Sequence, residues 1–278
     1  MRRHLVALGL LALLVASPRC GGTEPDELPV PVVTLDALPL PIPTAELPEA
    51  ARARAETVLA RAAFAQRVTD IRFPSREAAY RFLLDHPDFA ASVARALRLG
   101  EYRVTPLEDG YWGDDNRGAM GRIRVLYADD HRRLYHLEGR YERPLLPTIE
   151  GQLLLLLEFQ HGEDEAGGTV VDQSLTGHVR IDTPIIGALA QALGSLSRPL
   201  VERTVERKVR RFFRTVARVS RWASDEPEQL AAALDGHPEV PAGPTLAAFR
   251  AILLADRPPA WARASFRLTD DPPRLSEP

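Results

Sequence analysis

The sequence has almost no lysine and almost no cysteine. Lys208 is the only lysine among 35 basic residues, so no single arginine is informative merely because it is an arginine. Cys20 is the only cysteine, which excludes an internal disulfide. The net charge of −3 lacks the strong positive excess typical of nucleic-acid-binding proteins, so we predict no nucleic-acid partner. With 45% hydrophobic residues, the chain has enough apolar material to fold around a substantial core.

Motifs for the common catalytic and metal-binding sites are also missing. The sequence contains no P-loop, no dinucleotide-binding glycine motif and no Cys/His cluster. Residues 194–198 lack the second glycine of a nucleophile elbow and lie within a helical pattern. His131 and His136 are five residues apart, which places them on opposite faces of a strand, so we interpret them as solvated histidines. We therefore predict no catalytic residue, no cofactor and no metal.

The first residues predict export. Arg2 and Arg3 precede an apolar run over 5–16 that is too short to span a bilayer comfortably, and small residues follow it. We interpret 1–20 as a signal peptide of a periplasmic or secreted protein. Cys20 lies where bacterial lipoproteins carry their lipid, but the preceding Ser17-Pro18-Arg19 departs from the usual lipoprotein pattern. Lipidation of Cys20 is therefore the less favoured alternative.

Composition divides the rest of the chain into three parts. Residues 21–47 are rich in proline and predict an extended tether, with the alternative that part of the segment lies on the domain surface. Residues 48–223 carry helix and strand patterns and predict one folded domain. Residues 224–278 predict two short helices and a polar tail.

The folded part begins with helical stretches and continues with strands. Apolar stripes predict a helix near 48–65, a helix that Ser75 caps, and a further helix that ends at Gly100. Alternating apolar and polar residues, separated by turn signals such as Asp109-Gly110, predict strands. The predicted strands cover 67–73, 102–107, 111–112, 118–127, 131–143, 149–160 and 169–181. These spacings predict an α+β fold whose curved antiparallel sheet has six or seven strands in a meander.

A continuous amphipathic pattern follows from Thr183 to about Ala223 and predicts a long helix, kinked or broken at Pro199. From Arg198 to Arg221 it carries nine basic and two acidic residues. We interpret this as the solvated outer face of a helix that covers the sheet. The alternative is a surface that binds an anionic membrane or an acidic partner through Arg203, Arg207, Arg210, Arg214 and Arg221.

This order of elements resembles the helix-grip fold of the START-like (SRPBCC) superfamily, which includes lipid-transfer domains, plant pathogenesis-related ligand binders and polyketide cyclases. The resembling region is roughly 67–223. The Phe82-Leu83-Leu84-Asp85-His86-Pro87 stretch and the Asp182-Thr183-Pro184 start of the long helix look similar to sequences in such proteins. The resemblance implies a cavity between sheet and helix, but it carries over no catalytic residue.

The predicted function is noncatalytic binding of an apolar or amphipathic small molecule in that cavity. The residues expected to line it are Tyr135, Tyr141, Leu153, Leu155, Leu157 and Phe159, although for any single one of them an ordinary core position is the favoured alternative. The polar face of the last strand, which includes His178, is expected to face solvent; the alternative is a polar lining of the cavity. A cyclase- or hydrolase-like enzyme would need His178 and a carboxylate to converge inside the cavity.

Overall fold

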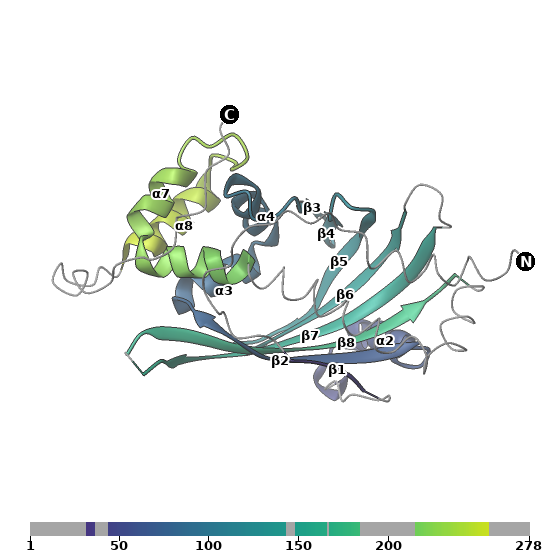
Figure 1. The fold of residues 1–278 in the computed structure, drawn as a ribbon. Helices are drawn as coiled ribbons and strands as arrows, with labels where there is room; N and C mark the ends of the chain where they lie inside the picture. The colour runs from purple at the N-terminus through teal and green to yellow at the C-terminus, as the bar shows by residue number, and fades with distance from the viewer. Residues whose placement is uncertain (1–31, 37–43, 143–147, 166, 184–214, 256–278) are drawn as a thin grey trace, which may run out of the picture.

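The computed structural model describes residues 32–36, 44–142, 148–165, 167–183 and 215–255. An open antiparallel sheet of eight strands runs through them in the order β1-β2-β8-β7-β6-β5-β4-β3. Helices lie on both sides of this curved sheet (Figure 1). The α+β class predicted from the sequence is confirmed.

All seven segments predicted as strands belong to the sheet, and β1 is an additional strand. The strands are β1 (Val32–Asp36), β2 (Phe64–Pro74), β3 (Arg103–Leu107), β4 (Gly110–Asp114), β5 (Ala119–Ala128), β6 (Arg132–Tyr141), β7 (Ile149–Glu163) and β8 (Thr169–Ile181). β1 lies within the segment predicted as a tether and pairs with β2 from Val32↔Thr69 to Asp36↔Ala65. These five residues are therefore part of the sheet.

The helices are η1 (Thr44–Glu46), α2 (Glu49–Leu59), α3 (Glu77–Asp85), α4 (Pro87–Ala96), a helix over 215–225, α7 (Pro227–Leu234) and α8 (Pro244–Ala255). Of the long helix predicted over 183–223, the structure describes only the part from 215 onward, which is helical. Thr183 is described but is not helical, and residues 184–214 lie outside the described part of the chain.

Strands β3 to β8 form the predicted meander, because each pairs with the next along the chain. The first strand of the folded domain departs from it: β2 pairs with the last strand, β8, instead of with β3. α3 and α4 lie between β2 and β3 in the sequence, so they connect strands that are far apart in the sheet.

The two faces of the sheet have different covers. We call the face that α2 covers the outer face; there Ala55 and Val58 pack against Leu134, Leu154 and Leu156. We call the opposite face the inner face. At one end of it, Tyr80 of α3 and Ala217 of the 215–225 helix pack against Leu157, Phe159 and other strand residues. Figure 1 shows α3, α4, α7 and α8 gathered at this end, with α2 on the other side.

A row of four glycines crosses the inner face away from these helices. Gly113, Gly121, Gly139 and Gly151 are successive cross-strand partners on β4 to β7. A Cβ atom on Gly121 would lie 2.4 Å from the carbonyl oxygen of Glu138, and one on Gly139 would lie 2.3 Å from that of Met120. The backbones approach too closely for side chains there, so this row lets the sheet curve.

Two helix ends differ from those predicted: the start of α3 and the end of α4. Ser75 does not cap α3, because its hydroxyl has no hydrogen-bond partner and Arg76 is the residue before the helix. The left-handed residue after α4 is Arg98, with φ +53°, instead of Gly100. The amide of Leu99 then donates to the carbonyl of Ala94 at 2.9 Å. Glycine is favoured in this left-handed conformation, but here the exposed Arg98 adopts it.

The helices after residue 223 share one hydrophobic core with α3 and α4. Phe249 of α8 lies 5.4 Å from the ring of Phe82 and 5.2 Å from that of Phe89. Leu230 and Leu234 of α7 are fully buried in the same cluster. The domain boundary predicted at 223/224 thus falls inside a continuous core.

Candidate functional site

The six residues predicted to line a cavity lie on one face of the sheet. Tyr135 pairs with Leu155, and Leu157 pairs with Arg133. Since alternate residues of a strand share a face, Tyr135, Tyr141, Leu153, Leu155, Leu157 and Phe159 all lie on the inner face. Leu157 and Phe159 are buried beneath α3 and the 215–225 helix, whereas the other four remain half-buried.

Half-buried apolar residues continue across the middle of the inner face. Leu153 and Leu155 alternate along β7 with Leu154 and Leu156, which are only 0% and 3% exposed beneath α2. Val125, which pairs with Tyr135, is 45% exposed. The described residues therefore cover the outer face of the central strands but leave an accessible apolar surface on the inner face. We call this surface the apolar floor and define it by Leu153, Leu155 and Val125.

His178 belongs to the outer face, separate from the other predicted cavity residues. It pairs with Leu154 and is 0% exposed. His136 pairs with Leu154 from the other side and is 3% exposed. The expected solvation of His136 and of the centre of the polar β8 face is therefore wrong, because α2 covers them. The convergence of His178 with a carboxylate inside the cavity, which the enzyme alternative required, is not present.

The outer face instead holds a chain of polar contacts. His136 Nε2 lies 3.1 Å from Gln152 Oε1, and Gln152 Nε2 donates to Asp182 at 3.2 Å. Asp182 in turn pairs with Arg180 at 2.6 Å. No group of three or more potential metal ligands occurs in the part of the chain that the structure describes. We interpret this chain as a means of satisfying buried polar groups beneath α2.

His136 predicts a loss of stability in mild acid. Burial lowers its pKa, and the nearby Arg124 and Arg54 act in the same direction, against the opposing effects of Gln152 and Glu138. The folded protein then binds fewer protons than the unfolded chain. The contribution of neutral His136 to the free energy of unfolding is fully present above the unfolded-state pKa of about 6.5. It is lost as the pH falls, by up to about 1.4 kcal/mol per pH unit for each proton.

Urea unfolding between pH 7.5 and 5 measures this effect. His136→Gln is expected to flatten the pH dependence, because an amide can still bond Gln152 but does not titrate. His131→Gln, at an exposed histidine, is the control and should leave the wild-type slope unchanged. An identical slope in wild type and His136→Gln would contradict the assignment.

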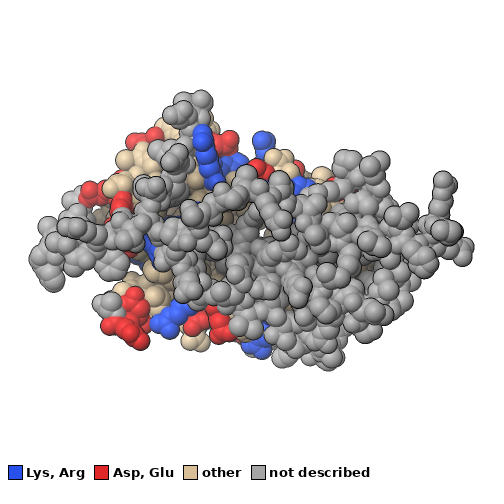
Figure 2. All heavy atoms as spheres, in the orientation of Figure 1, with Lys and Arg blue, Asp and Glu red and all other residues tan. Residues whose placement is uncertain are grey.

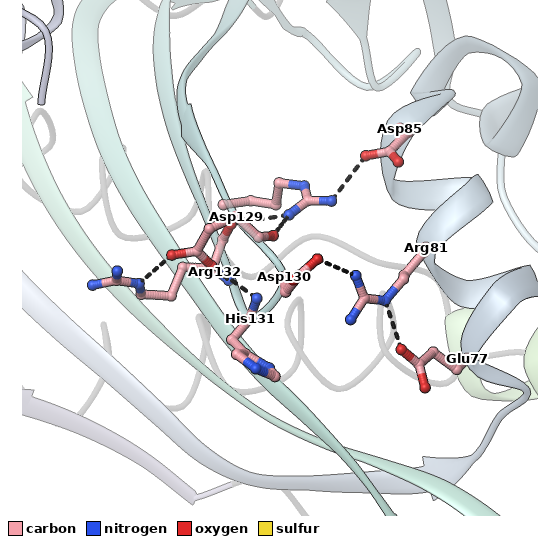
Figure 3. Close-up of polar contacts among 8 residues, drawn as sticks. Glu77, Arg81, Asp85, Asp129, Asp130, His131 and Arg132 are labelled. Carbon is pink, nitrogen blue, oxygen red and sulfur yellow. Dashed lines mark hydrogen bonds and ion pairs between the residues drawn. The ribbon is translucent and has the colours of Figure 1, made fainter.

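A polar cluster borders the apolar floor where the sheet meets α3. Arg133 is 7% exposed, and its Nη2 pairs with Asp85 of α3 at 3.0 Å. Its Nη1 donates to the carbonyl of Asp129, and its guanidinium lies 5.6 Å from the ring centre of Phe159. Figure 3 shows the ion pair at Asp85 beside a second contact, in which Arg81 of α3 bonds Asp130 at 2.7 Å. The two contacts fasten α3 to the β5–β6 turn.

Phenol and amide groups complete this cluster, which we call the polar end and define by Arg133, Tyr135, Tyr111, Tyr80 and Gln173. Tyr80 donates to Gln173 Oε1, while Gln173 Nε2 has no partner. Burial raises the pKa of Tyr135 to about 12, and it also raises the pKa of Tyr111 and Tyr80. All three phenols are therefore protonated donors at neutral pH.

Of the polar end, sequence reasoning identified only Tyr135. Arg133 has the same parity as Tyr135 and could have been assigned to the inner face from the strand pattern alone. Tyr80 and Gln173 come from α3 and β8, and only the register and the helix packing bring them to Arg133. No local signal in the sequence indicates that meeting.

A separate hollow of about 300 Å³ lies between α4, β3 and residues 241–245. Arg95 lies in its wall but already bonds Glu239 at 2.7 Å, the carbonyl of Tyr102 at 2.6 Å and Ser92 at 3.2 Å. Its main charged group is therefore occupied within the fold. For that reason we favour the inner face as the binding site.

The predicted membrane-binding surface lies mostly outside the described residues. This holds for Arg203, Arg207, Arg210, Arg214 and the lipidation candidate Cys20, whereas Arg221 is described and half-buried. Among the described residues that Figure 2 makes visible, acidic and basic side chains are interspersed. No helix in the described ranges is long and apolar enough to cross a membrane. Docking on an anionic surface stays a prediction.

Comparison with known proteins identifies no relative of this chain. No protein-family model matches the chain, and a search of curated proteins finds no match. The geometry of the inner face is therefore the basis for assigning a function.

Proposed function

We propose that this is an exported protein that binds an apolar or amphipathic small molecule on the inner face of its sheet. The observation that carries the proposal is the contrast along β7. Leu154 and Leu156 are sealed beneath α2, while Leu153 and Leu155 remain half-buried. Apolar area removed from water contributes about 25 cal/mol per Å², so a ligand on this floor gains affinity from contact alone.

The helix-grip arrangement predicted from the sequence would place a ligand at the same site. The 215–225 helix falls within the segment that the sequence predicts as a long helix, and its Val216 and Ala217 pack on the inner-face cluster around Leu157 and Phe159. A helix that continues toward the N-terminus from this position would form the opposite wall of the site. In the proposed arrangement, the ligand lies between that helix and the sheet.

The experiment is native mass spectrometry of the protein recovered from its producing cell. The expected spectrum shows an N-terminus near residues 17–20 and a non-covalent adduct of a few hundred daltons. Intact Met1 in the cytosolic fraction would overturn export. The absence of any adduct, together with failure to bind the apolar probe diphenylhexatriene, would overturn ligand binding.

A pair of variants locates the site. Leu155→Thr introduces a hydroxyl on the inner face and is expected to weaken diphenylhexatriene binding several-fold, because it removes apolar contact area. Gln160→Thr also introduces a threonine into β7, but at an exposed position on the outer face. It should not change the affinity for diphenylhexatriene. Equal affinities for the two variants would place the probe elsewhere.

A further inference from the structure

The unused hydrogen-bonding capacity on the inner face consists largely of donors. Gln173 is 3% exposed, and its amide oxygen is occupied by Tyr80 while its Nε2 has no partner. Gln66, at 9% exposure, also has an unpartnered Nε2. Its cross-strand partner is Gly177, which in turn pairs with Leu155 on the apolar floor. A buried N–H without an acceptor is unfavourable, so both amides favour an incoming acceptor oxygen.

Two phenols add donors on the same face of the sheet. Tyr135 shares the inner face of β6 with Arg133, and Tyr111 lies on the inner face of β4, opposite Ile123. Burial is the main cause of their raised pKa values, and the carboxylate of Asp85 raises both further. No described residue accepts a hydrogen bond from either phenol. Both hydroxyls are thus protonated and available.

The charges near the polar end disfavour an ionic headgroup. Arg133 is the only cation on the inner face of the described strands, and its pairing with Asp85 already neutralises it. Asp88 acts on Tyr111 as a second negative charge. An anionic headgroup would therefore meet two carboxylates and no free cation, whereas a cationic headgroup would leave the unpartnered N–H and O–H donors without an acceptor.

We infer that the ligand carries an uncharged polar group that accepts hydrogen bonds, such as a hydroxyl, ester or ketone oxygen, and that this group lies at the polar end. The apolar part of the molecule then extends over Leu153 and Leu155. This inference rests on the proposed function, because it orients the same ligand in the same site.

Molecules that share a saturated twelve-carbon chain and differ in the headgroup test the inference. Dodecanol, methyl dodecanoate, dodecanoate and dodecyltrimethylammonium would compete with diphenylhexatriene for the purified protein. The alcohol and the ester are expected to bind on the order of tenfold more tightly than either ion, since about 1.4 kcal/mol separates them. Equal affinities, or tighter binding of dodecanoate, would overturn the inference and leave the proposed function standing. Failure of the probe itself to bind would instead overturn the proposed function.

Matched phenol variants test the placement of the headgroup. Tyr135→Phe keeps the ring and removes one donor, so it is expected to weaken dodecanol binding about three- to tenfold without changing the affinity for diphenylhexatriene. Tyr127→Phe removes a phenol that lies on the outer face, opposite Leu134, and should leave both affinities unchanged. A wild-type affinity of Tyr135→Phe for dodecanol would overturn the placement.

Discussion

Replacing Phe249 by alanine is expected to destabilise the whole protein by about 3–5 kcal/mol. Phe249 is 0% exposed and packs against Phe82 of α3 and Phe89 of α4, which precede β3 in the chain. Removing its ring opens a cavity in a core that joins the C-terminal helices to the helices at the end of the sheet. Thermal and urea unfolding measure the effect. The transitions followed by circular dichroism and by tryptophan fluorescence should shift by the same amount.

Leu254→Ala is the matched control for this substitution. Leu254 belongs to the same helix but is 38% exposed, so its truncation is expected to cost less than about 1 kcal/mol. If Phe249→Ala lost only part of the helical signal while the rest of the protein melted as in wild type, the C-terminal helices would be an independent unit. That outcome would contradict the shared core.

Replacing Gly121 by alanine is expected to destabilise the sheet by about 2–3 kcal/mol, although alanine is the smallest side chain available. The added Cβ would lie 2.4 Å from the carbonyl oxygen of Glu138 and 2.6 Å from the Cα of Gly139. These are backbone atoms of the neighbouring strand, so relief requires the strands to separate or the sheet to flatten. The free energy of urea unfolding measures the effect.

Gly162→Ala provides the contrast within the same sheet. A Cβ at Gly162 would meet no atom within 4 Å, so the substitution is expected to be neutral or to stabilise the protein by up to about 1 kcal/mol. Diphenylhexatriene binding provides a second measurement, because a flatter sheet should hold the probe less well. Equal unfolding free energies for the two variants would show that the glycine row does not constrain the curvature.

Much of the sheet was predictable because its strands alternate regularly. Along β6 and β7, apolar and polar residues recur every second position, and that period is enough to recognise a strand and to group Tyr135 with Tyr141 or Leu153 with Leu155. The same period does not say whether the second face meets water. His136 and His178 read as polar outer positions, yet α2 covers both.

Local helix signals were also only partly informative. The stripe in α4 predicts a helix, but its end at Arg98 follows from backbone hydrogen bonding to Ala94, which overrides the preference for the nearby Gly100. Likewise, the prolines around β1 favour an extended chain, and its pairing with β2 depends on a strand edge that only the folded sheet offers.

The sequence by itself determined the α+β class, the strand segments and the shared face of the six apolar candidates, because these depend on the two-residue period of a strand and on turn residues close by in the chain. Only the tertiary structure decided that β2 joins β8, that four glycines align across the sheet, and that Arg133, Tyr80 and Gln173 meet at one end of the inner face. These features join residues distant in sequence through strand register and helix packing, and no local pattern specifies such long-range contacts.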